Sequence, residues 1–397
     1  MTTHGTTTPV HRTRLGRSGL NVSRIAFGTW QLGGDWGATD EQTAIRAIRH
    51  AYDCGINFFD TAQGYGFGAS ELLLAKAIHG YPRDSVVIAT KGGLRSLGGS
   101  RVERDASAAS IRKGVDDSLR ALATDYIDLL QVHWPDPGTP FAETAGALAE
   151  LVAAGKVRHV GVSNFDPQQM DEFSRTLPVE TLQPPYSLFH RDVEAEILPY
   201  AKAHEIGVLV YGPLAHGLLS GYLHPGRRLS PDDWRSHSPD FQGDALIDNL
   251  RAVAALEELA NTELGAPVSR LAVAWTLANP AVQVAIIGTR NAEHVDDAVA
   301  AAGLGLANDM LHRIDEIARG AVVLQARVRR QCDGDGCDPW HRQDGRRHGA
   351  PPGGLWFRRD VMESHIQQGS SLAYRPRGGH PGGGGPRCGR GHQQLDE

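Results

Sequence analysis

Short apolar runs, many of them rich in Val, Ile and Phe, recur along the first three quarters of the chain. Runs of this length and composition predict strands that are buried on both faces. We expect eight such strands, at Ile25–Phe27, Asn57–Phe59, Val86–Thr90, Ile127–Gln131, His159–Val162, Thr181–Gln183, Gly207–Val210 and Val284–Ile287. Before them, Arg14–Leu20 holds the turn pair Ser18-Gly19, which predicts an N-terminal β-hairpin.

Between these runs the apolar residues return every three or four positions, which is the spacing of one face of a helix. Ile45, Ile48 and Tyr52 form one such face, and Thr39 or Asp40 is suited to cap that helix. We expect further helices at 70–78, 111–122, 148–152, 167–175, 194–204 and 267–278, and an additional late helix at 310–318. The segment from Pro213 to Gly265 is expected to be a long loop after the seventh strand.

Regular alternation of strands and helices predicts parallel strands joined by right-handed crossovers. Eight such units in roughly 300 residues fit a (β/α)₈ barrel better than an open sheet. We therefore expect a flexible leader at residues 1–11, one barrel domain at residues 12–325 and a separate tail at residues 326–397.

The predicted tail is dominated by Gly, Arg, Pro, His and Gln and contains the run Pro381–Pro386, with four glycines in a row. Such a composition buries too little apolar surface to offset its ordering entropy, which predicts disorder. It also fits translation of a GC-rich gene in a shifted frame, a hypothesis that resequencing the gene would test. A zinc site at Cys332 and Cys337 is a weaker alternative, because no clear second pair of ligands accompanies them.

Composition excludes several classes of function. The chain has 397 residues, 41% of them hydrophobic, and a net charge of -6, so we expect no nucleic-acid partner. No apolar run approaches the ~18 residues that cross a bilayer, and the N-terminus lacks the pattern of a secretory signal. Only Cys54 lies in the patterned part, so a disulfide framework is not expected. These features predict a soluble, cytoplasmic protein without a membrane partner.

Four residues that can carry chemistry stand at or just after strand ends: Asp60, Tyr65, Lys91 and His133. Carboxyl ends of parallel strands meet at one face of a barrel, so these side chains should converge. Taken singly, a strand-end Asp or Lys is more often a cap or a salt-bridge partner, and a Tyr in a Gly-rich loop is more often packing. The joint occurrence of all four is what indicates a catalytic site.

The four groups form a proton-donating site, because a phenol stands beside an ammonium, a carboxylate and an imidazole. A free phenol has a pKa of about 10, too high for efficient proton donation near neutrality. A neighbouring ammonium would stabilise the phenolate, so Tyr65 is the expected general acid, Lys91 its activator and Asp60 the group that holds Lys91. His133 would donate a hydrogen bond to the substrate oxygen.

Five segments in register, at strand ends, resemble the aldo-keto reductase superfamily from about Arg14 to about Val323. They are Asn57–Tyr65, Ala89–Lys91, Gln131–Trp134, Gly161–Phe165 and Tyr211–Leu214. The resemblance implies a barrel that binds a nicotinamide cofactor at its C-terminal face, with no metal and no flavin, and that reduces a carbonyl by adding a hydride at carbon and a proton at oxygen. It further implies that Ser163, Asn164 and Gln183 bind the nicotinamide carboxamide and that Tyr211 stacks on the ring. Ser163 and Asn164 could alternatively cap the helix that starts near Pro167.

Residues at the later strand ends are expected to bind the remaining parts of the cofactor. Gly212, Leu214 and Gly217 would let the backbone approach the pyrophosphate. The last strand ends in Gly288, Thr289 and Arg290, a typical place for a phosphate beside a helix N-terminus. Arg290 matches the arginine near the adenosine 2′-phosphate in the family, which favours NADP(H), and His294 stands where the family often has a Gln. Ala298 departs from the family's usual Asn, which suggests one missing adenine contact.

For the substrate pocket we expect Trp30 and Trp134 as walls, together with the loop Leu218–Gly243, although core packing is an equal alternative for either Trp. The leading hypothesis is an NADPH-dependent reductase of aldehydes or ketones. Two alternatives are a cofactor-binding regulatory subunit resembling potassium-channel beta subunits, and a metal-dependent barrel hydrolase using His133 and Asp60. The physiological substrate, the favoured direction and the oligomeric state do not follow from the sequence.

Overall fold

The computed structural model describes residues 10–33, 40–98, 101–224, 226–227, 229–230 and 233–319. The predictions for most of the leader and for the tail 326–397, including the Cys332–Cys337 alternative, lie outside the described residues. Among the residues described, no helix is long and apolar enough to cross a membrane.

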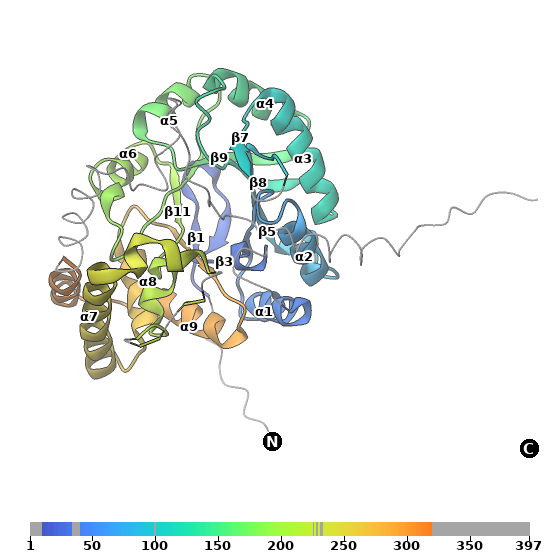
Figure 1. The fold of residues 1–397 in the computed structure, drawn as a ribbon. Helices are drawn as coiled ribbons and strands as arrows, with labels where there is room; N and C mark the ends of the chain where they lie inside the picture. Colours follow the sequence, from blue (N-terminus) through green and yellow to red (C-terminus); the bar gives the residue numbers. More distant parts are fainter. Residues whose placement is uncertain are drawn as a thin grey trace, which may run out of the picture. The chain divides into compact units, whose positions relative to one another are not determined.

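Eight parallel strands form a closed barrel surrounded by helices (Figure 1). Ile286 of the last strand pairs with Ala26 of the first, which closes the barrel. The barrel strands are β3 (Ile25–Gly28), β4 (Phe58–Asp60), β5 (Val87–Gly92), β8 (Ile127–Val132), β9 (Val157–Ser163), β10 (Thr181–Gln183), β11 (Gly207–Val210) and β12 (Val284–Gly288). The predicted (β/α)₈ barrel is confirmed.

Ten helices surround the barrel in the part of the chain that the structure describes. They are α1 (Glu41–Asp53), α2 (Ala69–Ile78), α3 (Ala108–Leu122), α4 (Phe141–Ala153), α5 (Pro167–Ser174), α6 (Ile197–Ala203), α7 (Gly243–Leu259), α8 (Val268–Ala278), α9 (Ala292–Ala302) and a last helix over 308–319. The carboxylate of Asp40 caps α1 by accepting a hydrogen bond from the Thr43 amide. Asp166 forms a capping box with Gln169 at the start of α5, so Ser163 and Asn164 are not the caps.

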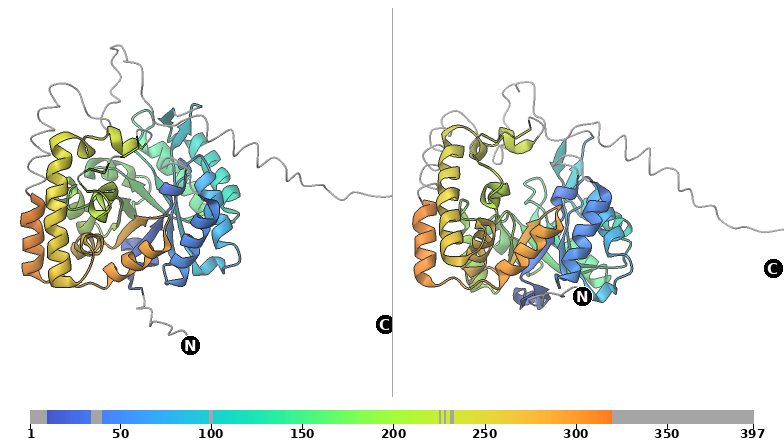
Figure 2. Two further views of the ribbon diagram at one scale, coloured as in Figure 1. Left: turned by 60° about the horizontal axis from the view of Figure 1, so that its bottom comes forward. Right: turned by 90° about the horizontal axis from the view of Figure 1, so that it is seen from below.

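Two regions differ from the expected pattern. The segment 213–265 is not simply a long loop, because it contains α7 and the short 3-10 turns η5 (Ala215–Ser220), η6 (Trp234–His237) and η7 (Pro239–Phe241). Val253 and Leu256 on one face of α7 are buried, and α7 lies beside the last helix (Figure 2). A small hairpin, β6 (Leu94–Ser96) with β7 (Val102–Arg104), also follows β5.

Alternate residues along the barrel strands contribute to two separate apolar cores. Phe58, Ala89 and Leu129 belong to a cluster inside the barrel, whereas their neighbours Phe59, Ile88 and Leu130 belong to the core between strands and helices. Successive side chains of a strand point to opposite faces, so every second residue points inward. Asp60, Lys91 and Gln131 each lie two residues beyond an inward residue, which places all three inside the C-terminal end of the barrel.

The N-terminal end of the barrel is covered by the hairpin β1 (Arg12–Arg14) and β2 (Asn21–Ser23) (Figure 2). Its Leu15 and Val22 belong to the inner cluster. Gly16 has φ 50, and a Cβ atom there would lie 2.1 Å from the backbone nitrogen of Gly207, so the close approach requires glycine. The hairpin therefore acts as an apolar plug.

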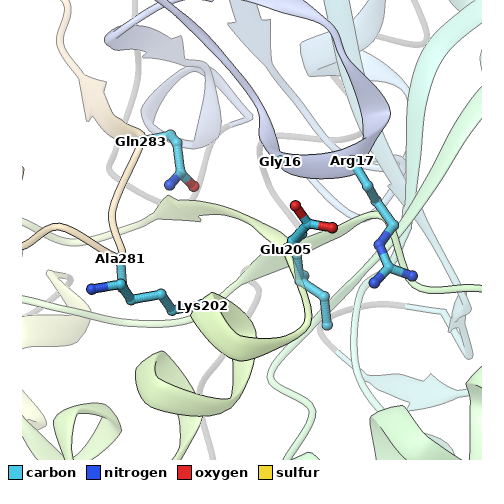
Figure 3. A pocket seen from close by; sticks show the side chains of 7 residues that line it. Gly16, Arg17, Lys202, Glu205, Ala281 and Gln283 are labelled. Atoms are coloured by element: carbon cyan, nitrogen blue, oxygen red, sulfur yellow. The ribbon is translucent and has the colours of Figure 1, made fainter.

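A cavity of about 250 Å³ lies beside this hairpin, and Figure 3 shows Arg17, Lys202 and Glu205 around it. Its other lining residues are Gly16, Ile206, Ala281 and Gln283. Ile206 immediately precedes β11 and Gln283 immediately precedes β12, so the cavity faces the N-terminal ends of the strands. It lies at the opposite end from Asp60 and Lys91.

Candidate active site

Lys91 and Asp60 form a buried ion pair inside the barrel mouth. The Lys91 Nζ atom lies 2.6 Å from Asp60 Oδ1, and the two side chains are 1% and 3% exposed. The same ammonium also donates to the Thr61 carbonyl, at 2.9 Å. Burial lowers the pKa of Lys91, and the Asp60 carboxylate offsets part of that effect. A buried charge of this kind is costly unless it is paired, so the two residues depend on each other.

Tyr65 reaches this ion pair from the loop after β4. Its hydroxyl accepts a hydrogen bond from Lys91 Nζ at 3.2 Å. The loop returns tightly after Tyr65: Gly66 has φ 67, and a Cβ atom there would lie 2.5 Å from the Gly33 carbonyl oxygen. Only glycine tolerates that position, and the resulting turn fixes the direction of the phenol.

His133 follows β8 and stands against the phenol. The two rings are 5.7 Å apart between centroids and nearly perpendicular, at 82°. Burial and the nearby charge of Lys91 hold the pKa of His133 well below its usual range. Its Nδ1 atom is buried without a hydrogen-bond partner. The ring is therefore a neutral imidazole, and the described residues leave its Nδ1 atom without a partner.

A chain of hydrogen bonds connects this cluster to the residues expected to bind nicotinamide. The amide of Gln183 donates to Asp60 Oδ2 and to Gln131 Oε1, both at 2.9 Å. The Ser163 hydroxyl donates to the Gln183 carbonyl at 2.8 Å. The Asn164 amide donates to Ser163 Oγ at 3.0 Å and to the His133 carbonyl at 3.1 Å. The C-terminal ends of five strands thus share one polar network, in which Gln131 was not expected.

Asn164 stands in a conformation that few residues adopt, with φ 63. Asn is among the few non-glycine residues that tolerate this left-handed region. Its side-chain oxygen accepts a hydrogen bond from the Tyr211 hydroxyl at 3.0 Å. Burial raises the pKa of Tyr211, with a smaller contribution from Tyr65, so Tyr211 stays a neutral phenol. Backbone strain of this kind persists where surrounding contacts determine it and is concentrated at functional sites.

The end of β12 leads directly into α9. Thr289 Oγ1 receives a hydrogen bond from the Asn291 amide at 3.0 Å and lies 3.1 Å from His294 Nδ1. Arg290 is half-buried between Thr289 and Asn291, and Gly288 ends the strand. These four predicted residues therefore gather around the N-terminus of α9, where free amides favour an anion.

The segment after β11 crosses towards Arg290. Gly212 and Gly217 have φ 68 and 100, and Leu214 lies between them at the start of η5. Arg235 donates to the His216 carbonyl at 3.0 Å and forms a forked ion pair with Asp233. Burial alone would raise the pKa of Asp233, but bonds from Arg235, and to a smaller degree the charge of Arg290, hold it below its usual range. Arg235 was not expected from the sequence.

Aromatic rings cover Tyr65. The Trp30 ring stacks on Tyr65 with 6.3 Å between centroids, and Trp234 lies 5.9 Å from Trp30. His216 stands edge-on to both indoles. Trp234 falls in the loop 218–243 expected to line the pocket, but no local pattern singled it or His216 out. Trp134 is elsewhere engaged: the Arg104 guanidinium lies over its ring, 5.1 Å from the centroid.

Comparison with known protein sequences shows which family the chain resembles. The model of the "Aldo/keto reductase family" matches residues 24–319. "Aldo-keto reductase YhdN" of Bacillus subtilis is 47% identical over 70% of this chain and 84% of its own length. An "NADH-specific methylglyoxal reductase" of Escherichia coli is 34% identical over 74% and 94%. A "putative voltage-gated potassium channel subunit beta" of Schizosaccharomyces pombe is 33% identical over 76% and 92%.

Solved structures agree with this result. A glycerol dehydrogenase from Gluconobacter oxydans has a TM-score of 0.73 and 40% identity, covering 80% of this chain and 97% of that one. An aldo/keto reductase from Klebsiella pneumoniae in complex with NADP and acetate has a TM-score of 0.61 and 31% identity, covering 77% and 95%. The matched segment contains the whole barrel and the polar network at its mouth. The chain belongs to the aldo-keto reductase family.

Proposed function

We propose that this protein is an NADP(H)-dependent reductase of aldehydes or ketones in which Tyr65 donates the proton. The observation that carries the proposal is the contact between the Tyr65 hydroxyl and Lys91 Nζ, 3.2 Å apart, with Asp60 2.6 Å behind the ammonium. An ammonium fixed beside a phenol lowers the cost of forming phenolate, which is the state Tyr65 reaches after giving up its proton.

The bound nicotinamide would supply the hydride, and the chain's residues supply the proton and the orientation. Tyr65 gives its phenolic proton to the carbonyl oxygen as negative charge develops there. Lys91 then balances the phenolate, and Asp60 prevents the ammonium from turning away. Because the Lys91 ammonium is buried, its charge acts more strongly on Tyr65 than it would in water.

His133 would orient the substrate carbonyl. A neutral imidazole can donate one hydrogen bond and adds no full positive charge that would compete with Lys91. The lowered pKa of His133, from burial and from Lys91, supports the neutral form at working pH. A substrate oxygen within reach of both Tyr65 and His133 would receive one hydrogen bond from each.

The residues around Asn164 fit the carboxamide of nicotinamide. Ser163, Asn164 and Gln183 offer hydroxyl and amide groups, and an amide ligand both donates and accepts. Their mutual hydrogen bonds hold them in place, and the left-handed backbone at Asn164 supports a binding role. The ring of Tyr211, anchored to Asn164 through its hydroxyl, would provide the stacking surface.

Cofactor preference depends on Arg290. A guanidinium beside a helix N-terminus suits a phosphate, which favours NADP(H). The Klebsiella relative was solved with NADP, whereas the Escherichia coli relative is named NADH-specific, so family membership alone does not decide the matter. Asp233 opposes the preference here, since its carboxylate already interacts with Arg290 and would repel a phosphate.

The substrate side is aromatic. Trp30 stacks on the Tyr65 ring and Trp234 lies beside Trp30, and indoles are apolar walls with a donor NH. We infer a preference for aldehydes or ketones that carry an apolar or planar group.

The test is oxidation of NADPH, followed by its absorbance, with a panel of aliphatic and aromatic aldehydes. Tyr65→Phe should lower turnover roughly 10²–10⁴-fold while NADPH binding, measured by fluorescence, is retained. Tyr52→Phe is the matched control, because it removes a phenol hydroxyl that donates to Ser85 outside the barrel. Equal turnover in both variants would remove Tyr65 as the acid.

A second function is a cofactor-binding regulatory subunit, which the 33% identity with the Schizosaccharomyces pombe protein supports. It would bind NADPH without oxidising it across the whole panel and would co-purify with a membrane protein. Turnover that depends on Tyr65 decides against it.

A further inference from the structure

A second cluster of reactive side chains lies far from the proposed reductase chemistry, in the outer layer of helices. His50 is in the last turn of α1 and Cys54 caps that helix, four residues later on the same face. Asp296 projects from α9, which packs against α1. These helices meet where β12 pairs with β3, at the seam between the last and the first unit of the barrel.

The three donor atoms are already gathered. His50 Nε2 lies 2.8 Å from Asp296 Oδ1, and Cys54 Sγ lies 3.4 Å from each of these atoms. Tetrahedral zinc binds nitrogen or oxygen at about 2.0–2.1 Å and sulfur at about 2.3 Å, which separates neighbouring donors by about 3.3–3.6 Å. Two of the three separations match, and the third needs a movement of about half an ångström.

The donor types point to a class of cation. Thiolate and imidazole select zinc or a similar transition metal over calcium or magnesium, which prefer oxygen. His50 and Asp296 side chains are 36% and 61% exposed, so water can reach the open position that three protein ligands leave. Among the residues that the structure describes, no other group of three such donors is as close together.

A reactive, redox-sensing thiol is the competing interpretation of Cys54. Burial, with help from Asp296, raises the pKa of Cys54 to about 11, so the free thiol stays protonated and is a poor nucleophile. A cation bound between the three groups would displace the thiol proton, which would leave to bulk water as the metal–sulfur bond forms.

We propose that His50, Cys54 and Asp296 form a mononuclear binding site for zinc, with water as the fourth ligand, that joins α1 to α9 across the seam of the barrel. The bound ion replaces a hydrogen-bonded triad by metal–ligand bonds between two helices. It therefore stabilises the closed barrel without contacting the reactants.

The test uses Co²⁺ as a spectroscopic probe on the full chain. The chain holds four cysteines, so Cys332, Cys337 and Cys388 are first replaced by Ser, which leaves Cys54 as the single thiol. One equivalent of Co²⁺ should then produce a thiolate charge-transfer band and the strong visible bands of tetrahedral cobalt, and Zn²⁺ should abolish both and raise the Tm.

Ligand variants decide the assignment. Cys54→Ser should remove the charge-transfer band, and His50→Gln or Asp296→Asn should weaken Co²⁺ binding at least about 100-fold, because even outer partners of a metal cost up to that much. Asp297→Asn is the matched control: it removes the same charge one residue along α9, where the carboxylate pairs with Arg270. No thiolate band in the background chain, a band that survives Cys54→Ser, or equal loss in Asp297→Asn would overturn the proposal.

Discussion

The two ends of the barrel are built from the same eight strands and differ in what their inward positions hold. At the N-terminal end those positions are apolar, and Leu15 and Val22 of the hairpin pack into the same apolar cluster. At the C-terminal end they are Asp60, Lys91 and Gln131, joined by hydrogen bonds. Burial of apolar surface is favourable by itself, whereas a buried polar group costs free energy unless it is paired, and Gln131 Nε2 and His133 Nδ1 are buried here without a partner among the described residues. One end thus contributes stability, and the other depends on the pairing of its buried charges, Lys91 and Asp60.

The largest effect should come from breaking that pairing. Lys91→Met leaves the buried Asp60 carboxylate without its cation, and we expect a loss of about 3–5 kcal/mol in the free energy of unfolding, together with loss of turnover. Urea denaturation measures the first quantity and NADPH oxidation the second.

The double variant Asp60→Asn with Lys91→Met is the control for this prediction. It removes both charges, so stability should largely return while turnover stays low. If the double variant is as unstable as the single one, lost packing and not an unpaired charge explains the effect.

A substitution at the apolar end should lower stability without changing turnover. Leu15→Ala removes a fully buried side chain from the plug, which should cost about 2–5 kcal/mol in the free energy of unfolding. The kcat of the folded enzyme should not change, because Leu15 lies far from Tyr65. A drop in kcat measured well below the new Tm would show that the two ends are coupled.

A smaller effect should distinguish the proposed phosphate site at Arg290 from the proposed proton donor Tyr65, both at the C-terminal end of the barrel. Arg290→Ala should raise the KM for NADPH roughly 10–100-fold, since a charge-assisted hydrogen bond contributes about 1.5–3 kcal/mol. The KM for NADH should stay unchanged, and so should kcat, because the proposed proton donor is Tyr65 and not Arg290. An equal rise for both cofactors would remove the 2′-phosphate as the partner of Arg290.

The smallest expected effect concerns the aromatic cover. Burial lowers the pKa of His216 to about 4, with His190 adding to this, Asp240 opposing it and Arg235 adding least. The folded protein therefore binds this proton less readily than the unfolded chain, so stability is full above about pH 6.5 and is lost as the pH falls towards 4.

His216→Asn tests this, because Asn tolerates the φ of 54 at that position and does not titrate. Relative to this variant, the wild type should lose about 1–2 kcal/mol between pH 7 and pH 5 in urea unfolding. Parallel pH profiles for the two proteins would show that the imidazole is not kept neutral by the fold.

Much of the architecture could be predicted because it depends on local pattern. All eight barrel strands begin and end within two residues of the apolar runs that predicted them, since a strand buried on both faces leaves a strong signal. The helix α7 was missed although Leu246, Leu250 and Val253 have helical spacing, because the Gly- and Pro-rich segment before it dominated the interpretation. The hairpin β6–β7 lacks apolar residues at most positions and leaves little signal.

Site residues could be predicted from the sequence where they stand at the ends of barrel strands, because those ends meet at one face of the barrel. Asp60, Lys91 and His133 could be selected because each ends an apolar run. Trp234 and His216 could not, because they meet Trp30 only through a loop of irregular conformation. Contacts between residues some 200 positions apart follow from the closed fold, and no local spacing encodes them.

The plug at the N-terminal end has a consequence for synthesis of the chain. The Arg17 backbone amide donates a hydrogen bond to the Glu205 carbonyl, and Gly16 packs against the backbone of Gly207. About 190 residues separate these partners, which at roughly 5–20 residues per second is a delay of about 10–40 s on the ribosome. During that time Leu15 and Val22 have no barrel to enter. The nascent chain therefore exposes the apolar hairpin, a segment that a chaperone could bind until the seventh strand of the barrel emerges.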